Sequence, residues 1–347
     1  MTRLRVVQWA TGNIGLRSLR HVIEHPDMTL AGLYVTSPAK VGQDAGELCG
    51  LPPTGVKATN DADEIIALGA DCVLYMPANC DFDQICAILA AGTNIVTTRG
   101  EFHHPGSLPP ADRERVEAAC AKGGTSIHST GSSPGFITEA VPLVLASIQR
   151  RLDSLAIYEY ADLASRNSPE MLFDLMGFGH TPQEFPPERF AYAAHLSGPS
   201  MRVLADAVGL PLDSITSTGE VAVTPVPLTI AAGTLEAGTV AAQRTVITGT
   251  HNGRPLITRT ATWYCSEQTE PAWTVPGWDG WNVRLEGDCP LDIDIKFSIP
   301  EGQMGEMTPG YTANPAVNAV PYVCAAPPGI RTSADLPPII PSLGSAA

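Results

Sequence analysis

Basic residues are scarce in this chain, whose 347 residues include 21 Lys and Arg against 36 Asp and Glu, a formal net charge of -15. Nucleic acids and anionic membrane surfaces are recognised by clustered Lys and Arg, so this scarcity excludes both as expected partners. The sequence also lacks an apolar run as long as a membrane span. Because an apolar strand pattern begins at Leu4, we expect no signal peptide and a cytoplasmic protein.

Closely spaced cysteines are lacking as well, since none of the eight falls in a C-x-x-C pair. Zinc sites and redox motifs depend on such spacing, so we expect reduced thiols, no disulfide framework and no bound metal. What the sequence has instead is 44% apolar residues with only 16% charged residues. This balance is typical of a globular chain with enough core for two domains of ordinary size.

The N-terminus carries the strongest local signal, a short apolar strand over 4–9, a glycine turn and a helix over 13–24. The turn reads Ala10-x-Gly12-x-x-Gly15, so alanine replaces the first glycine of G-x-G-x-x-G. This order brings the backbone close to a dinucleotide pyrophosphate and points the free N–H groups of a helix start at it. The alternative is an ordinary strand–helix turn. We favour the dinucleotide site because a βαβ pattern follows.

Strands and helices alternate over residues 1–150. The strands are expected at 4–9, 29–35, 71–76, 94–98 and 125–128, and the helices at 13–24, 62–68, 81–91, 110–122 and 136–148. Several of these strands are continuously apolar, which is typical of a parallel sheet buried on both faces. We therefore predict an α/β chain whose dinucleotide-binding domain, residues 1–150, is a Rossmann-type doubly wound parallel sheet.

Beyond Arg151 the pattern changes to long strands in which apolar and polar residues alternate. They are expected at 154–160, 214–223, 238–251, 255–264 and 281–299, with helical segments at 169–176, 200–208 and 314–325. Such strands favour a mainly antiparallel open sheet with one exposed face. We predict an α+β substrate and dimerisation domain over 151–310 and a C-terminal segment, 311–347, that returns to the first domain. Open edges and this sheet indicate a homodimer.

The end of the second predicted strand lacks the Asp or Glu that binds the ribose 2′-hydroxyl in NAD-specific sites. Thr36, Ser37 and Lys40 lie there instead. Two hydroxyls and a cation suit a 2′-phosphate, so we predict NADP, with NAD as the second candidate. The alternative is that the hydroxyls cap a loop and Lys40 is solvated.

We expect the cofactor to be bound by residues of the glycine turn, two strand ends and the last helix. These residues are Thr11, Gly12, Asn13, Ile14, Thr36, Ser37, Lys40, Pro77 and Asn314.

Glu101 ends the segment Thr97-Thr-Arg-Gly-Glu101, which follows the predicted strand over 94–98. At this edge of a doubly wound sheet the nicotinamide and the reacting substrate meet. Apolar walls raise the pKa of a glutamate, so that it exchanges protons near neutral pH. We predict that Glu101 is the catalytic residue. The alternative is a surface glutamate before a loop in which His103 and His104 have no partner at metal-ligand spacing.

Six segments spread over nearly the whole chain resemble one family. They are Val7-Gln-Trp-Ala-Thr-Gly-Asn-Ile-Gly15, 37–46, 97–101, 133–136, 168–173 and 314–321. The chain resembles the NAD(P)-dependent reductases with a dihydrodipicolinate-reductase-like fold, in particular the 2,4-diaminopentanoate dehydrogenase and native amine dehydrogenase group. The resemblance implies an oxidoreductase that makes an amine reversibly from a small ketone or aldehyde, ammonia and NAD(P)H. It also implies that Glu101 handles protons on the amine nitrogen.

The chain departs from true dihydrodipicolinate reductases in lacking their His-His…Lys stretch, so lysine biosynthesis is not expected. An iminium accepts hydride better than a ketone does, and a neighbouring carboxylate stabilises its positive charge. We therefore predict an amine dehydrogenase that transfers hydride to an iminium carbon. Two alternatives are another C=N or carbonyl reductase of the same fold and a non-catalytic NADP-binding sensor.

Overall fold

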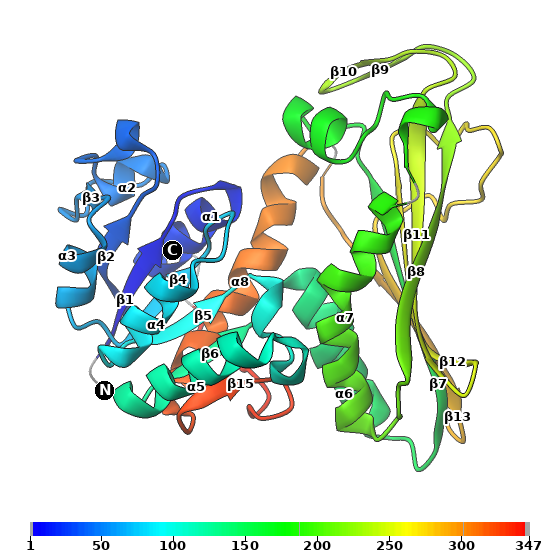
Figure 1. The fold of residues 1–347 in the computed structure, drawn as a ribbon. Coiled ribbons are helices and arrows are strands. Elements are labelled where there is room, and N and C mark those ends of the chain that lie inside the picture. The colour runs from blue at the N-terminus through cyan, green and yellow to red at the C-terminus, as the bar shows by residue number, and fades with distance from the viewer. Residues whose placement is uncertain (1–2, 187, 301, 344–347) are drawn as a thin grey trace. The chain divides into compact units, whose positions relative to one another are not determined.

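The computed structural model describes residues 3–186, 188–300 and 302–343, and the chain divides into two compact units (Figure 1). The first unit comprises Met1–Ala140 and Thr308–Ala347, and the second comprises Val141–Met307. Across the described ranges, no helix has the length and apolar character needed to span a membrane.

The first unit is built on a seven-stranded sheet in which every strand pair is parallel. Its order is β15-β6-β5-β4-β1-β2-β3. The strands are β1 (Leu4–Trp9), β2 (Met28–Tyr34), β3 (Ala58–Thr59), β4 (Cys72–Tyr75), β5 (Asn94–Thr97), β6 (Ser126–Ser129) and β15 (Gly329–Arg331). From β1 the chain adds β2 and β3 on one side of the sheet and then β4, β5 and β6 on the other. Doubly wound sheets bind ligands at such a reversal of strand order. The predicted Rossmann-type sheet is confirmed.

Helices cover both faces of this sheet because alternate residues of its strands are buried in different cores. Val6 packs in a core with residues of α1 and α8, whereas Val7 packs in a core with residues of α3, α4 and α5. The helices of this part of the chain are α1 (Asn13–Glu24), α2 (Ala45–Leu48), α3 (Ala62–Ala67), α4 (Phe82–Ala90), α5 (Pro110–Gly123) and α8 (Met304–Ala325).

Capping residues fix several helix ends where the sequence places them. Asp61 and Asp81 accept hydrogen bonds from the first backbone N–H groups of α3 and α4. α5 begins with a proline and ends before Gly124, whose φ of +67° suits a glycine. The sequence therefore predicted these boundaries closely.

In the first unit two short strands were not predicted, because β3 and β15 are too short to show an alternating pattern. β15 pairs with β6, and Leu336 packs in the core of the first unit. The helix expected at 136–148 is instead a distorted segment, Ser132–Ala140, followed by α6 (Val141–Ala146). Gly135, with φ +121°, interrupts its helical backbone.

The second unit contains a six-stranded sheet with the order β14-β13-β7-β12-β11-β8. The strands are β7 (Leu152–Asp162), β8 (Ser214–Val223), β11 (Val240–His251), β12 (Arg254–Tyr264), β13 (Gly280–Gly287) and β14 (Leu291–Lys296), with a separate hairpin of β9 (Leu228–Ile230) and β10 (Gly233–Leu235). All pairs in the large sheet are antiparallel except β7 with β12, so the predicted mainly antiparallel sheet is confirmed.

Three predicted boundaries in this part of the chain are wrong. The single strand expected over 281–299 is the hairpin of β13 and β14. α7 (Glu188–Val208) and α8 begin well before the residues expected for them, and both contain prolines inside the helix, at Pro199 and Pro309 among others. Because proline ordinarily ends or starts a helix, the sequence hides such continuous helices.

Shorter helical turns complete the described chain. They are η1 (Pro38–Lys40), η2 (Gly100–Phe102), η3 (Pro105–Ser107), η4 (Ser132–Ala140), η5 (Glu170–Leu175) and η6 (Pro182–Glu184).

Candidate active site

The glycine turn after β1 is held by a buried glutamine. Ala10 adopts φ +75°, a conformation that glycine reaches more easily than alanine. The Nε2 atom of Gln8 donates to the Ala10 carbonyl at 2.9 Å, and Ser18 Oγ donates to Gln8 Oε1 at 2.7 Å. These bonds hold Ala10 in that conformation, at the position where the motif has its first glycine.

The two remaining glycines of the turn do different things. A Cβ on Gly15 would lie 2.2 Å from the Ala10 carbonyl oxygen, so Gly15 allows α1 to pack directly on the turn. A Cβ on Gly12 would meet no protein atom within 4 Å, and no described side chain caps α1 at this residue. The first N–H groups of α1, from Asn13 and Ile14, therefore border open space. Such a helix start fits a dinucleotide pyrophosphate.

Lys40 comes back to this turn from the loop after β2. Its Nζ donates to the Thr11 carbonyl at 2.9 Å and to Thr11 Oγ1 at 3.0 Å. Thr36 is exposed and Ser37 is half-buried just before Lys40. Lys40, which is expected to bind a 2′-phosphate, is thus hydrogen-bonded to Thr11 of the turn that is expected to bind the pyrophosphate.

Asn314, a residue of α8, contacts α1 at a point away from the glycine turn. Its Oδ1 is 3.0 Å from Nδ1 of His21, about two helical turns beyond the glycine turn. Burial lowers the pKa of His21, and the neighbouring His25 lowers it further. Pro77 is half-buried in the loop that follows β4. The structure therefore does not gather all the expected cofactor residues around one loop.

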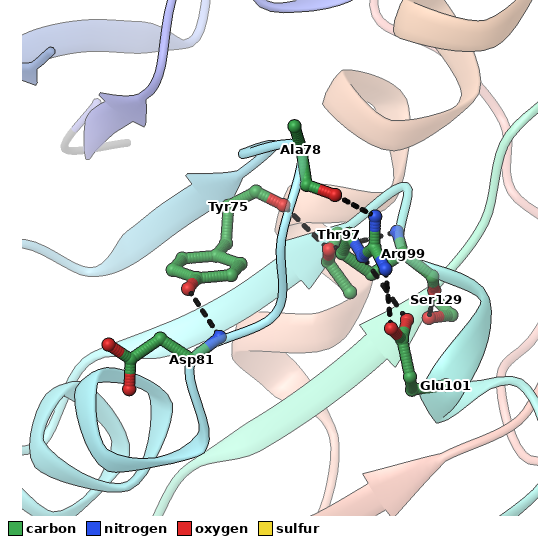
Figure 2. A network of polar contacts seen from close by, with 7 residues as sticks. All are labelled: Tyr75, Ala78, Asp81, Thr97, Arg99, Glu101 and Ser129. Carbon is green, nitrogen blue, oxygen red and sulfur yellow. Dashed lines mark hydrogen bonds and ion pairs between the residues drawn. The ribbon is translucent and has the colours of Figure 1, made fainter. Parts of the chain in front are cut away.

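Glu101 lies in the turn that follows β5, and its carboxylate faces Arg99 (Figure 2). Nε of Arg99 is 3.2 Å from Oε2 of Glu101, and Nη2 is 2.5 Å from Oε1. The expectation of apolar walls is wrong at this contact, since the group that faces the carboxylate is a guanidinium. Arg99 directly precedes the helical turn Gly100–Phe102, so its closeness to Glu101 in the sequence was the available signal.

Hydrogen bonds tie together the ends of three neighbouring strands around this pair (Figure 2). Thr97 Oγ1 donates to the Tyr75 carbonyl at 2.6 Å and accepts from the Arg99 backbone N–H at 3.1 Å. Ser129 Oγ donates to the Arg99 carbonyl, and Nη1 of Arg99 donates to the Ala78 carbonyl at 2.5 Å. The carboxyl ends of β4, β5 and β6 thus form one hydrogen-bonded frame.

The thiol and phenol nearest this frame are uncharged at neutral pH. Burial raises the pKa of Cys80 to about 12, and the negative charge of Glu101 adds to the effect. Burial also raises the pKa of Tyr75 to about 12. Because only a thiolate is a good nucleophile, Cys80 does not provide nucleophilic catalysis here.

A buried histidine–carboxylate contact lies beside the turn that carries Glu101. His103 and Glu139 are each at most 1% exposed, and Nδ1 of His103 lies 2.6 Å from Oε1 of Glu139. Ser333 donates to the other carboxylate oxygen of Glu139. Nearby, burial lowers the pKa of His128, whose Nδ1 is 2.8 Å from the Arg331 carbonyl.

This buried pair joins the Glu101 turn to the segment Ser132–Ala140 and to the C-terminal segment. His103 therefore has a carboxylate partner inside the fold. His104 lies 2.8 Å from Ser107 Oγ through its Nδ1. Among the residues that the structure describes, no three His, Cys, Asp or Glu side chains gather as a metal site would require. Sequence reasoning missed Glu139, which lies far from His103 along the chain.

Known proteins resemble this chain in sequence and in fold. The model of the 2,4-diaminopentanoate dehydrogenase C-terminal domain matches residues 136–346. An amine dehydrogenase of Streptomyces virginiae is 29% identical over 355 aligned positions, with 98% of each chain covered. A 2,4-diaminopentanoate dehydrogenase of Acetoanaerobium sticklandii is 25% identical over 260 positions, which cover 74% of this chain and 70% of that one.

The fold is shared with a solved structure. That of an amine dehydrogenase from Mycobacterium smegmatis superposes with a TM-score of 0.77, at 21% identity and 97% coverage of both chains.

Substitution of the two glycines separates their roles. Gly12→Ala places a methyl group in the open space at the helix start, so NADPH affinity falls by about tenfold while the melting temperature is nearly unchanged. Gly15→Ala forces a methyl group against the Ala10 carbonyl, so affinity falls and the melting temperature drops by several degrees. Fluorescence titration with NADPH and calorimetry measure both effects. Wild-type affinity in Gly12→Ala would contradict the assignment of the turn.

Proposed function

Because the chain belongs to the family of the 2,4-diaminopentanoate dehydrogenase C-terminal domain, whose model matches more than half of it, we propose that it is an NAD(P)-dependent amine dehydrogenase. It converts a small ketone or aldehyde, ammonia, NAD(P)H and a proton into an amine, water and NAD(P)⁺, reversibly. Similarity over nearly its whole length to an amine dehydrogenase carries this conclusion. The free helix start beside Gly12 supports the nicotinamide dinucleotide.

The chain's own residues divide the work of binding and proton transfer. The glycine turn and the start of α1 would hold the pyrophosphate of the cofactor, and Lys40 would hold the 2′-phosphate on its adenosine ribose. The bound nicotinamide supplies or accepts the hydride. Glu101 takes a proton from the ammonia nitrogen as it adds to the carbonyl, while the carbonyl oxygen takes a proton from solvent. Glu101 then returns its proton to the carbinolamine hydroxyl, which leaves as water, and the carboxylate's negative charge stabilises the iminium.

The position and partner of Glu101 support this role. It follows β5 at the carboxyl edge of a parallel sheet, where ligands bind in doubly wound folds. A guanidinium fork stabilises the ionised form of a carboxylate. Each carboxylate offers about four acceptor positions, so two N–H bonds from Arg99 leave others for the substrate nitrogen.

Glu101→Gln tests the catalytic assignment. The amide cannot accept a proton or neutralise an iminium, so we expect amination to slow by about 10²–10⁴-fold. NADPH affinity stays at the wild-type value. Nicotinamide absorbance measures turnover with pentan-2-one, cyclohexanone and butanal, each with and without ammonium chloride.

Glu117→Gln on the exposed face of α5 is the matched control and keeps the wild-type rate. Full activity in Glu101→Gln would end the catalytic assignment. Turnover that does not depend on ammonium would instead identify an ordinary carbonyl reductase.

NADP is the preferred cofactor in this proposal. Lys40 supports it, because its ammonium group is held beside the glycine turn and Thr36 and Ser37 stand nearby in the sequence.

Reduced thiols are stable in the cytoplasm, so the eight free cysteines support a cytoplasmic location.

Lys40→Ala tests the preference. Loss of one charged hydrogen bond to the 2′-phosphate weakens NADPH binding by about 10-fold to 100-fold. NADH binding changes much less, since NADH lacks that phosphate. Paired titrations with the two cofactors measure the difference, with Lys122→Ala on exposed α5 as the control. Equal losses for NADH and NADPH would assign Lys40 to the turn alone.

We further propose a homodimer formed through the large sheet of the second unit. A row of neighbouring residues, Thr218, Val246, Thr260 and Tyr158, crosses β8, β11, β12 and β7 in register. These side chains are exposed or half-buried. The opposite face packs against α7, where Phe190 lies over Gly219. A two-fold axis would pair the open face with itself.

Val246→Glu tests this interface. It places a negative charge in the middle of the row and, at a two-fold axis, opposite its own copy, so the dimer dissociates. Size-exclusion chromatography with light scattering measures the mass. Leu175→Glu, at a side chain that is 70% exposed in the same unit, is the control and stays dimeric. A dimer unaffected by Val246→Glu would place the interface elsewhere, and a monomeric wild type would remove it.

A further inference from the structure

We propose that Arg99 is a positioning residue of the reaction: its guanidinium fixes the orientation of the Glu101 carboxylate and places a positive charge beside it. The inference rests on the proposed function, because it assigns a partner to the proton-handling group. Arg99 itself does not touch the substrate. It acts on the reaction through Glu101.

The contact between the two side chains is a fork rather than a single bond. Two different guanidinium nitrogens of Arg99 reach two different oxygens of Glu101, at 3.2 and 2.5 Å. Neither side chain is more than 30% exposed. A two-point contact fixes the plane of the carboxylate as well as its position, which one hydrogen bond cannot do.

Arg99 is also anchored independently of Glu101. Its third nitrogen donates to the Ala78 carbonyl, its backbone N–H donates to Thr97, and its carbonyl accepts from Ser129. The Arg99 backbone is therefore held at the ends of β5 and β6, and its guanidinium is held by the loop that follows β4. Arg115 differs from it, since that side chain is 48% exposed and pairs with an Asp83 that is 87% exposed.

This anchoring has a chemical consequence for the carboxylate. Because arginine does not lose its proton in proteins, Arg99 cannot act as the acid and remains a fixed positive charge. The fork occupies one acceptor position on each oxygen, so the remaining positions define the direction from which a substrate nitrogen can approach. Lysine would supply the charge without the fork.

The experiment compares Arg99→Leu, Arg99→Lys and the matched surface control Arg115→Leu. Values of kcat and of KM for cyclohexanone are measured with ammonium chloride and NADPH at one fixed pH, together with NADPH affinity and melting temperature.

Arg99→Leu slows turnover by about 10-fold to 100-fold, a loss of about 1.4–2.7 kcal/mol in transition-state stabilisation. The loss falls on kcat while KM for the ketone changes little, because a misoriented carboxylate slows the chemical step. Arg99→Lys is also slower than wild type, because lysine supplies the charge without the fork. Arg115→Leu matches the wild type, and NADPH affinity is unchanged throughout.

A double-mutant cycle separates positioning from a structural role. If Arg99 acts through Glu101, Arg99→Leu adds nothing to the loss already caused by Glu101→Gln. Additive losses, or a loss for Arg99→Leu that falls on KM alone, would overturn the inference. An active Glu101→Gln enzyme would instead overturn the proposed function, so the two failures are distinguishable.

Discussion

Parallel pairing of β4, β5 and β6 is the constraint on which the candidate site depends. Parallel strands end at a common edge, so residues that are distant in sequence arrive side by side without any long-range motif. Tyr75, Thr97 and Ser129 occupy equivalent last positions of their strands. The frame that holds Arg99, and through it Glu101, is therefore a direct product of the sheet register.

The sequence predicted most of the first sheet because its elements carry independent local signals. α1 begins at Asn13 and ends at Glu24, as expected from the glycine turn and the apolar stripe. The same reasoning failed where the signal was not local. Pro199 lies inside α7, and β15 is a three-residue strand held by its pairing with β6. Such elements depend on tertiary contacts that a single sequence does not display.

The candidate site shows the same division. The expected position of Glu101 follows from strand order, but its surroundings do not. The expectation of apolar walls overlooked Arg99, which stands two residues before Glu101 and contacts it across the turn Gly100–Phe102. Glu139 gave no signal at all, since its partner His103 belongs to another segment. Such a contact between distant segments is visible only once the chain has folded.

A carboxylate held by a fixed arginine suits a reaction that runs in both directions. Reductive amination places positive charge on the substrate nitrogen in the middle of the reaction, whichever way it proceeds. A negative group that keeps its position and charge stabilises that state without rearranging, and preorganised charge is the main source of electrostatic catalysis. Neutralisation by Arg99 weakens the attraction, but it also lets the carboxylate stand at a partly buried strand end where a lone charge would be unfavourable. The strand-end frame therefore weakens the attraction between Glu101 and the positive substrate nitrogen, but it holds the base in a fixed position.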